Sequence, residues 1–364
     1  MKIRQSRSPG LARLMAIGAT VALVLAACSS AATPSPSVAS APPTTAATQA
    51  ATTPAPSATS SKTLQIAYIS FAVANSYDAP MLAAAQAAAA AGNAQLTVLD
   101  GNLDPAAQTK DLQDAIASGK YDGIVVQPVY GASLVTGVQA AIAKGIAVGN
   151  IDQVLGSDFT TAQPQVQGLS ANVIFVASTL GKKIADLAIK ACASANPCKI
   201  GYIFSVKAAA LDQELRKAFD AELATNPNVK VVAEGESFYT SGAGLKAAQD
   251  MLTAHSDINV IMGADQAITG ALQAVTTAGV KGKVALVGYG GGAVALQGIA
   301  SGDRYGTVMQ APATEGRVGI TNLIQAIRTG KATDGVDVLA NLPDGGVVTK
   351  DNVQTFLPLA EWPG

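Results

Sequence analysis

LQIAYISFAVANSYDAPMLAAAQAAAAA, residues 64–91, is the stretch that decides the fold of this chain. Its first seven residues are mostly apolar and have the length of a buried strand. Asp78 as the expected N-cap and Pro80 in the first turn then open an alanine-rich helix that ends before Gly92. The turn between them, residues 71–77, is expected at the carboxyl end of the strand, where parallel α/β sheets bind ligands.

The same unit of strand, turn and helix recurs along the rest of the chain. Apolar runs predict strands at 95–100, 123–127, 146–151, 199–204, 229–234, 259–262, 283–288 and 307–310. Helices are expected at 104–118, 133–144, 172–193, 212–225, 242–255, 268–277, 294–301 and 313–329. Strands that alternate with helices predict right-handed crossovers and parallel sheets, here in two similar α/β halves with a ligand cleft between them.

The amino terminus predicts export. Four basic residues precede residues 14–27, an uncharged and mostly apolar run that is too short to span a membrane and fits a signal peptide. The run ends in Leu25-Ala26-Ala27-Cys28, which resembles the bacterial lipobox, whose cysteine is diacylated and becomes the first residue. We expect residues 1–27 to be a lipoprotein signal peptide and Cys28 to carry the lipid; the alternative is an ordinary signal peptide with a chance cysteine.

Residues 28–62 are nearly all Ala, Ser, Thr and Pro, and contain no acidic residue. Such a segment cannot bury a core, so we expect a disordered tether between the lipid and the folded part. The protein is then expected on the outer face of the cytoplasmic membrane, or on the periplasmic or cell-surface side.

Charge and cysteine content narrow the function further. Four of the 24 basic residues lie in the leader, whereas all 25 acidic residues follow it. The sequence contains no basic patch, so nucleic acid is not an expected partner. Cys192 and Cys198 remain after Cys28 is lipidated and are expected to form a disulfide in an oxidising compartment. A metal site is the alternative, but His255 is the only histidine, so we predict no metal and no zinc.

From about Leu64 to Val353 the chain resembles the ribose-binding class of solute-binding proteins of ABC importers. The segments that carry this resemblance are NSY at 75–77, YDGIVVQP at 121–128, GNID at 149–152, MLTAH at 251–255, ADQAITGAL at 264–272, VGY at 287–289 and VVTKDNV at 347–353. The resemblance implies two Rossmann-like lobes joined by three crossings, near Ala171, Gln310 and Leu342-Pro343. The first lobe would be residues 63–171 plus 311–342, the second 172–310 plus 343–364, and the helix at 313–329 would pack on the first lobe.

The resemblance also implies ligand-binding positions, several of which depart from the pattern of the sugar-binding members. Gln153 and Gln213 stand where those members have arginines, Ala264 replaces an asparagine, and Gly290 replaces an aspartate. Bidentate arginines and paired carboxylates hold vicinal hydroxyls in such sites, so the usual pentose or hexose held in the usual way is not expected. The ligand-binding residues implied are Phe71, Asn75, Tyr77, Asp78, Asp152, Gln153, Gln213, Tyr239, Asp265, Tyr289 and Gln310.

These residues predict a small ligand that is neutral or weakly cationic, and sugar-like molecules are the first candidates. Asp78, Asp152 and Asp265 would lie near the cleft without a cation evident in the sequence, so an anionic ligand would be repelled. For Asp265 a turn or helix cap is an equal alternative. Phe71 and Tyr239 could equally belong to the lobe cores.

Three functional classes remain distinct at this stage. The first is a monomeric binding protein without a cofactor that delivers its ligand to an ABC permease in the membrane. The alternative is a sensor that binds its ligand and docks on a membrane receptor for chemotaxis or two-component signalling. An enzyme is not predicted, because the sequence shows no nucleophile–base pair, metal cluster or glycosidase-like pair of acids at recognisable spacing.

Overall fold

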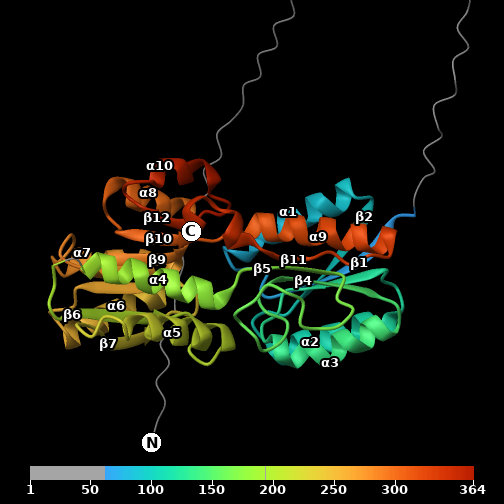
Figure 1. Cartoon of the computed structure of the whole chain (residues 1–364), viewed down its shortest axis with the longest axis horizontal. Helices are drawn as coiled ribbons and strands as arrows, with labels where there is room; N and C mark the ends of the chain where they lie inside the picture. Colours follow the sequence, from blue (N-terminus) through green and yellow to red (C-terminus); the bar gives the residue numbers. More distant parts are fainter. Residues whose placement is uncertain (1–61, 193) are drawn as a thin grey trace, which may run out of the picture. The chain divides into compact units, whose positions relative to one another are not determined.

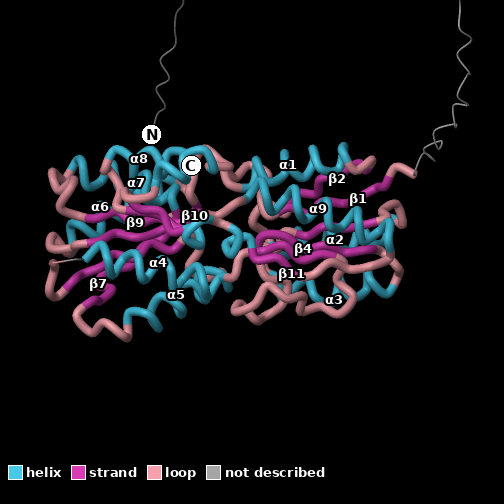
Figure 2. The backbone as a smooth tube through the Cα atoms, turned by 45° about the horizontal axis from the view of Figure 1, so that its top comes forward, coloured by secondary structure: helices cyan, strands magenta, loops and turns pink. Residues whose placement is uncertain are grey.

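Two six-stranded sheets with helices packed on both faces make up the computed structural model, which describes residues 62–192 and 194–364 (Figures 1 and 2). All of these residues belong to one compact unit of the chain. The leader, Cys28 and most of the expected tether lie outside the described residues. The predicted α/β class with two sheets of mainly parallel strands is confirmed.

The first sheet has the strand order β11-β5-β4-β3-β1-β2, and all of its strands are parallel. Its strands are β1 (Leu64–Ser70), β2 (Ala94–Asp100), β3 (Gly123–Val126), β4 (Ala147–Asp152), β5 (Ala171–Ile174) and β11 (Gly335–Asp337). Its helices are α1 (Asp78–Ala91), α2 (Pro105–Ser118), α3 (Gly131–Ala143) and α9 (Pro312–Thr329).

The second sheet has the order β12-β10-β9-β8-β6-β7, in which only the β10–β12 pair is antiparallel. Its strands are β6 (Cys198–Phe204), β7 (Val229–Glu236), β8 (Val260–Ala264), β9 (Ala285–Gly290), β10 (Gly306–Met309) and β12 (Val347–Thr349). Its helices are α4 (Ala177–Cys192), α5 (Ala210–Leu223), α6 (Ser241–Ala254), α7 (Asp265–Thr277), α8 (Ala293–Ser301) and α10 (Val353–Phe356).

Helix α9 packs on the first sheet beside α1, although more than 200 residues separate the two helices in sequence (Figure 1). Small residues allow this close approach: a Cβ at Gly316 would lie 2.1 Å from the carbonyl oxygen of Met81. The alanines of α1 serve the same purpose, since Ala85 and Ala89 are almost fully buried. Helix α9 therefore packs on the first sheet, as expected for the helix predicted at residues 313–329.

One predicted element is wrong. Residues 172–193 do not form one helix; β5 pairs with β4 and β11, and α4 begins only at Ala177. The chain therefore leaves the first sheet after Ile174, a few residues beyond Ala171, near which the first crossing was predicted. A four-residue strand buried on both faces has the same apolar pattern as the first turn of a buried helix, so periodicity could not separate the two.

The carboxyl-terminal part of the chain also contains strands that the sequence did not predict. Strand β11 extends the first sheet and β12 extends the second, so the chain crosses once more between them. Cys192, the last residue of α4, is joined to Cys198, the first residue of β6, by a disulfide with an Sγ–Sγ distance of 2.05 Å. No helix within the described ranges is long and apolar enough to cross a membrane.

Candidate functional site

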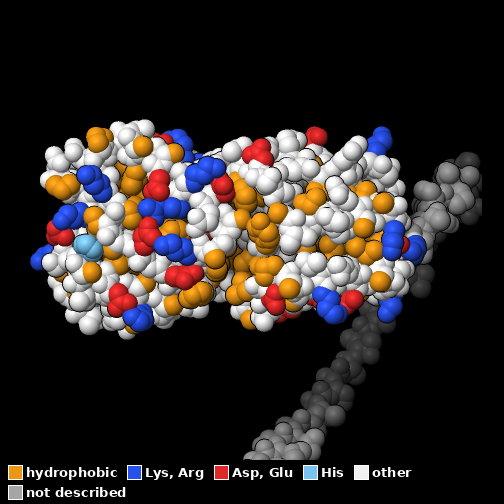
Figure 3. Space-filling model, turned by 90° about the horizontal axis from the view of Figure 1, so that it is seen from below, with side chains coloured by type: hydrophobic (Ala, Val, Ile, Leu, Met, Phe, Trp, Pro, Cys, Tyr) orange, Lys and Arg blue, Asp and Glu red, His pale blue; other side chains and the backbone are white. Residues whose placement is uncertain are grey.

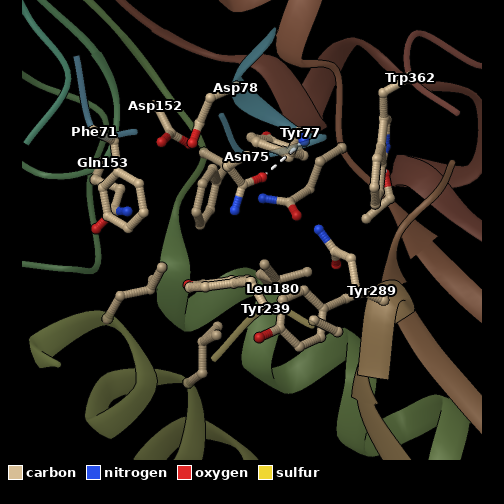
Figure 4. A pocket seen from close by; sticks show the side chains of 17 residues that line it. Phe71, Asn75, Tyr77, Asp78, Asp152, Gln153, Leu180, Tyr239, Tyr289 and Trp362 are labelled. Carbon is tan, nitrogen blue, oxygen red and sulfur yellow. Dashed lines mark hydrogen bonds between the residues drawn. The ribbon is translucent and has the colours of Figure 1, made fainter. Parts of the chain in front are cut away.

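A pocket lies where the carboxyl ends of strands from both sheets meet, as parallel α/β topology predicts (Figure 4). It contains about 480 Å³ of empty space, counting the solvent at its open mouth. We call it the central pocket. Its lining residues are Phe71, Asn75, Tyr77, Asp78, Asp152, Gln153, Phe175, Leu180, Leu211, Leu215, Tyr239, Ala264, Gln266, Tyr289, Gly290, Gln310 and Trp362.

Two carboxyl groups lie side by side on the wall that the first sheet contributes (Figure 4). The amide nitrogen Nε2 of Gln127 donates to Oδ1 of Asp78 at 2.5 Å and to Oδ2 of Asp152 at 3.1 Å. The other amide atom of Gln127, Oε1, accepts from the backbone N–H of Phe71 at 3.2 Å, which fixes the orientation of the amide. Oδ2 of Asp78 has no hydrogen-bond partner among the described residues, although Asp78 is only 3% exposed.

The role predicted for Asp78 at the helix terminus is wrong. Asp78 is the first residue of α1, and its side chain makes no cap. Instead, Oδ1 of Asn75 accepts a hydrogen bond from the backbone N–H of Tyr77 at 2.8 Å, which closes the turn before the helix. The carboxyl group of Asp78 is therefore turned toward the pocket.

Burial raises the pKa of each carboxyl group in this wall. Removal from water is the main cause for Asp152, whose pKa rises to about 7. The pKa of Asp78 rises well above its usual value through burial and through repulsion by Asp152. Glu315, on α9 behind the pocket, is fully buried, and burial followed by the charge of Asp152 raises its pKa in the same direction.

Aromatic rings form much of the remaining lining. Phe71, from the first sheet, meets Tyr239, from the second, edge to face with ring centroids 6.2 Å apart. Tyr77 meets Trp362 in the same manner at 5.6 Å. Tyr289 is held by a 2.7 Å hydrogen bond between its hydroxyl and Oγ of Ser205.

Two lining residues have backbone conformations that L-residues seldom adopt. The φ angle is +70° at Asp152 and +54° at Tyr239. Such positions cost free energy and cluster at ligand sites, where the surrounding structure holds them. Asp152 is the last residue of β4, and Tyr239 lies in the turn after β7.

The structure brings all but two of the predicted ligand-binding residues to the central pocket. Phe71, Tyr239 and Tyr289 line it, as do Asn75, Tyr77, Asp78, Asp152, Gln153 and Gln310. Gln213 is one of the exceptions: it is exposed on α5, and its amide nitrogen donates to the carbonyl oxygen of Lys207. Contact with a ligand remains a prediction for each residue in the lining.

Asp265 is the second exception and is a structural residue. It is buried against Arg304, with Nη1 of the arginine 3.2 Å from its Oδ1. Its carboxylate also accepts from the hydroxyl of Thr307 at 3.1 Å and from the backbone N–H of Gly291 at 2.6 Å. Arg304, which has no local sequence signal, therefore supplies Asp265 with a cation that was not evident in the sequence.

Trp362 explains one departure from the family pattern. At Gly290, φ is +127°, and a Cβ atom would lie 2.6 Å from Cζ2 of Trp362. The indole Nε1–H donates to the carbonyl oxygen of Gly290 at 2.9 Å. The tryptophan ring therefore lies close to the position where the family's aspartate side chain would begin.

Several functional candidates were missed by sequence reasoning. Phe175, Gln266, Trp362 and three leucines also line the pocket, and Asp212 lies behind Tyr239 and Tyr289. Burial raises the pKa of Asp212 to about 7. Trp362 has no sequence signal that would place it in the pocket. Asp212 stands at the expected start of a helix, where an acidic residue is common and does not indicate a ligand site.

The lining is suited to holding a small molecule by hydrogen bonds and ring contacts. Among residues 62–192 and 194–364, no group of three or more His, Cys, Asp or Glu side chains is placed to hold a metal ion. None of the described lining residues is a serine, cysteine or histidine that could act with a neighbouring base.

The sequence of this chain is similar to those of known periplasmic binding proteins. The sequence profile described as periplasmic binding protein domain matches residues 66–332. The ribose import binding protein of Bacillus subtilis is 24% identical over 228 residues, which cover 62% of this chain and 68% of that protein. The D-allose-binding periplasmic protein of Escherichia coli is 26% identical over 233 residues, covering 60% and 70%.

Solved structures show the same fold. An ABC transporter solute-binding protein from Mycobacterium smegmatis with bound glycerol has a TM-score of 0.69 and 24% identity, covering 83% of this chain and all of that one. The myo-inositol-binding protein of Caulobacter, with bound myo-inositol, has a TM-score of 0.68 and 22% identity, covering 81% and 96%.

Proposed function

Because this chain belongs to the family of periplasmic binding protein domains, we propose that it is an extracytoplasmic solute-binding protein. It captures a sugar or a sugar-like small molecule and delivers it to an ABC importer. The observation that carries the proposal is the central pocket, whose lining comes from the strand ends of both sheets. Side chains from two lobes that surround one ligand are what a protein needs to enclose it and release it elsewhere.

The composition of the lining supports a small polyhydroxylated solute. Asn75, Asp152 and Gln310 offer donors and acceptors, while aromatic rings can cover the apolar face of a sugar ring. The relatives named for ribose and D-allose, and the solved structures with glycerol and myo-inositol, support this class. Gln153 stands where the sugar-binding pattern has an arginine, so the polar contacts differ from those of the family.

The proposed activity is binding, without catalysis or cofactor, by a monomer. The relatives with detectable similarity are binding proteins by name, and the described lining lacks a nucleophile–base pair. An ABC permease is the proposed membrane partner.

A screen for thermal stabilisation of the purified mature chain tests the proposal. Sugars, polyols, nucleosides, amino acids and organic acids are compared, and mass spectrometry identifies any solute that the protein retains from the cell. We expect a sugar or a polyol-like solute to give the largest rise in Tm, since ligands stabilise the state that binds them. An organic acid as the best ligand would contradict the charge argument, and no response to sugars and polyols would contradict the proposal.

We further propose that Cys28 anchors the mature protein to a membrane by its lipid. The basis is the sequence Leu25-Ala26-Ala27-Cys28 after an apolar run. The wild type is expected to partition into detergent, and the Cys28→Ala variant into the aqueous phase. If the processed variant still fractionates with membranes, the anchor lies elsewhere.

A further inference from the structure

The central pocket contains carboxyl groups but no cation of its own. Asp78 and Asp152 line it, and among its described lining residues none is Lys, Arg or His. On the opposite side, the buried Asp212 adds a third acid behind Tyr239 and Tyr289. Buried carboxylates without a partner charge are costly, so the site is incomplete electrostatically as it stands.

Several cations of the described chain pair with acids that do not line the pocket. On the face shown in Figure 3, Lys and Arg side chains lie on the outside, interspersed with Asp and Glu. Lys207 and Arg216 both pair with Glu234, and Lys182 pairs with Glu222, all on the surface. Arg304 is buried but pairs with Asp265, which does not line the pocket.

Two polar atoms of the pocket lining, Oδ2 of Asp78 and the hydroxyl of Tyr77, have no hydrogen-bond partner among the described residues. Gln127 donates to Oδ1 of Asp78 and to Oδ2 of Asp152, so its two amide hydrogens are both used. Oδ2 of Asp78 has no partner among the described residues, and Asp78 is nearly fully buried and lines the pocket. A solute with an N–H or O–H donor would satisfy this buried acceptor.

Aromatic rings surround the same space from other directions. Figure 4 shows Asp78 and Asp152 on one wall and the rings of Tyr239 and Tyr289 across from them, with Tyr77 and Trp362 to one side. Phe71 and Phe175 complete a set of six rings in the lining. The face of an aromatic ring attracts a cation, most strongly in a site without water, and clustered rings are how proteins hold ammonium groups.

We propose that the solute carries a positively charged nitrogen on a small polyhydroxy framework, as in an amino sugar or an aminopolyol. This inference rests on the proposed function and narrows its ligand class. The ammonium group donates to Oδ2 of Asp78 and to the carboxylate of Asp152, and its charge replaces the proton or cation that these groups otherwise lack. The rings cover the rest of the ligand. The pKa values, which burial raises at Asp78 and Asp152, agree with carboxyl groups that have no cation nearby.

The inference is tested with pairs of probes that differ by one group. D-glucosamine is compared with D-glucose, D-galactosamine with D-galactose, and 3-amino-1,2-propanediol with glycerol, by calorimetry on the mature chain at neutral pH. Methylammonium serves as a cation that has N–H donors but no hydroxyl groups. We expect the amine of the best-binding pair to bind about tenfold to a hundredfold more tightly than its hydroxyl partner, the range for one charge-assisted hydrogen bond.

Two variants locate the effect. In Asp78→Asn the preference for the amine should fall to within about threefold, because the neutral amide keeps the size of the side chain but loses its charge. Asp114→Asn removes the same charge from an exposed position on α2 and should leave the preference unchanged.

The outcomes separate this inference from the proposed function. If the hydroxyl partners bind as tightly as the amines or more tightly, the inference is wrong and the proposed function stands. If methylammonium binds while no sugar or polyol of either series does, the cation site stands and the proposed sugar class is wrong. If nothing binds to the folded protein, both are contradicted.

Discussion

Asp152 and Asp265 are both buried, and both lie at the carboxyl end of a central strand, one in each sheet. Asp265 is surrounded by partners from its own chain: a guanidinium, a hydroxyl and a backbone N–H. Asp152 has side-chain hydrogen bonds with Gln127, Gln153 and Glu315 but no cation, and it faces the central pocket beside Asp78. Position along the strand does not tell whether the charge of a buried aspartate is compensated within the chain; the presence of an internal cation does.

The largest expected effect concerns the aspartate that has its own cation. Arg304→Met leaves Asp265 buried without its partner charge, and we expect the free energy of unfolding to fall by about 3–5 kcal/mol. Urea denaturation measures the loss. Lys281→Met, which breaks an exposed ion pair with Asp303, is the matched control and should change stability by less than about 1 kcal/mol. Equal losses in the two variants would show that the buried pair is not needed.

The pH dependence of stability is the second expected effect and concerns Asp152. Its pKa is about 7 in the folded state, above the ordinary value of 3.8, so the folded state binds more protons between these values. The contribution to stability is therefore present below pH 4 and lost as pH rises through 7, by about 1.4 kcal/mol per pKa unit. The titratable groups that interact with Asp152 are Asp78, Glu315, Tyr68, Tyr77 and Tyr239.

Urea titrations between pH 4 and pH 8 without ligand test this dependence. The wild type should lose stability as pH rises, and Asp152→Asn should show a flatter profile. Asparagine also tolerates the positive φ of this position, so the substitution does not add backbone strain. A wild type that becomes steadily more stable from pH 4 to pH 8 would contradict the assignment of buried, uncompensated carboxyl groups.

The third prediction concerns the ring that the sequence did not place in the site. Trp362→Ala removes a wall of the central pocket, and we expect affinity for the solute to fall by about 2–4 kcal/mol, as for buried aromatic anchors. Trp362→Phe keeps a ring but loses the bond to Gly290, so it should lose about 0.5–1.5 kcal/mol. Calorimetry measures both. If the alanine variant binds as the wild type does, Trp362 only supports the fold.

Local sequence carried enough information for most of the fold. The strand and helix of residues 64–91 appear where alternation, Pro80 and Gly92 predicted them, because these signals act within a few residues. Strand β5 was missed because four buried residues before a helix, one of them Asn172, are too few to show a periodicity of their own. The short strands β11 and β12 depend on a partner strand distant in sequence.

Part of the candidate site could also be predicted from local sequence. Residues in the turns after β1 and β4 could be found, because strand ends meet at one edge of a parallel sheet. The roles of Asp265 and Trp362 could not, since each depends on a contact with a residue 39 or 72 positions away. Whether an aspartate is compensated is a property of the tertiary structure.

The central claim is that Asp152 contacts the solute whereas Asp265 supports the fold, and one paired measurement tests it directly. Affinity by calorimetry and stability by urea denaturation are determined for Asp152→Asn and for Thr307→Val, which removes one hydrogen bond to Asp265. We predict that Asp152→Asn loses about 1.5–3 kcal/mol of binding free energy without losing stability. Thr307→Val should lose about 1 kcal/mol of stability with unchanged affinity. Unchanged affinity in Asp152→Asn, or a matching loss of affinity in Thr307→Val, would contradict the account.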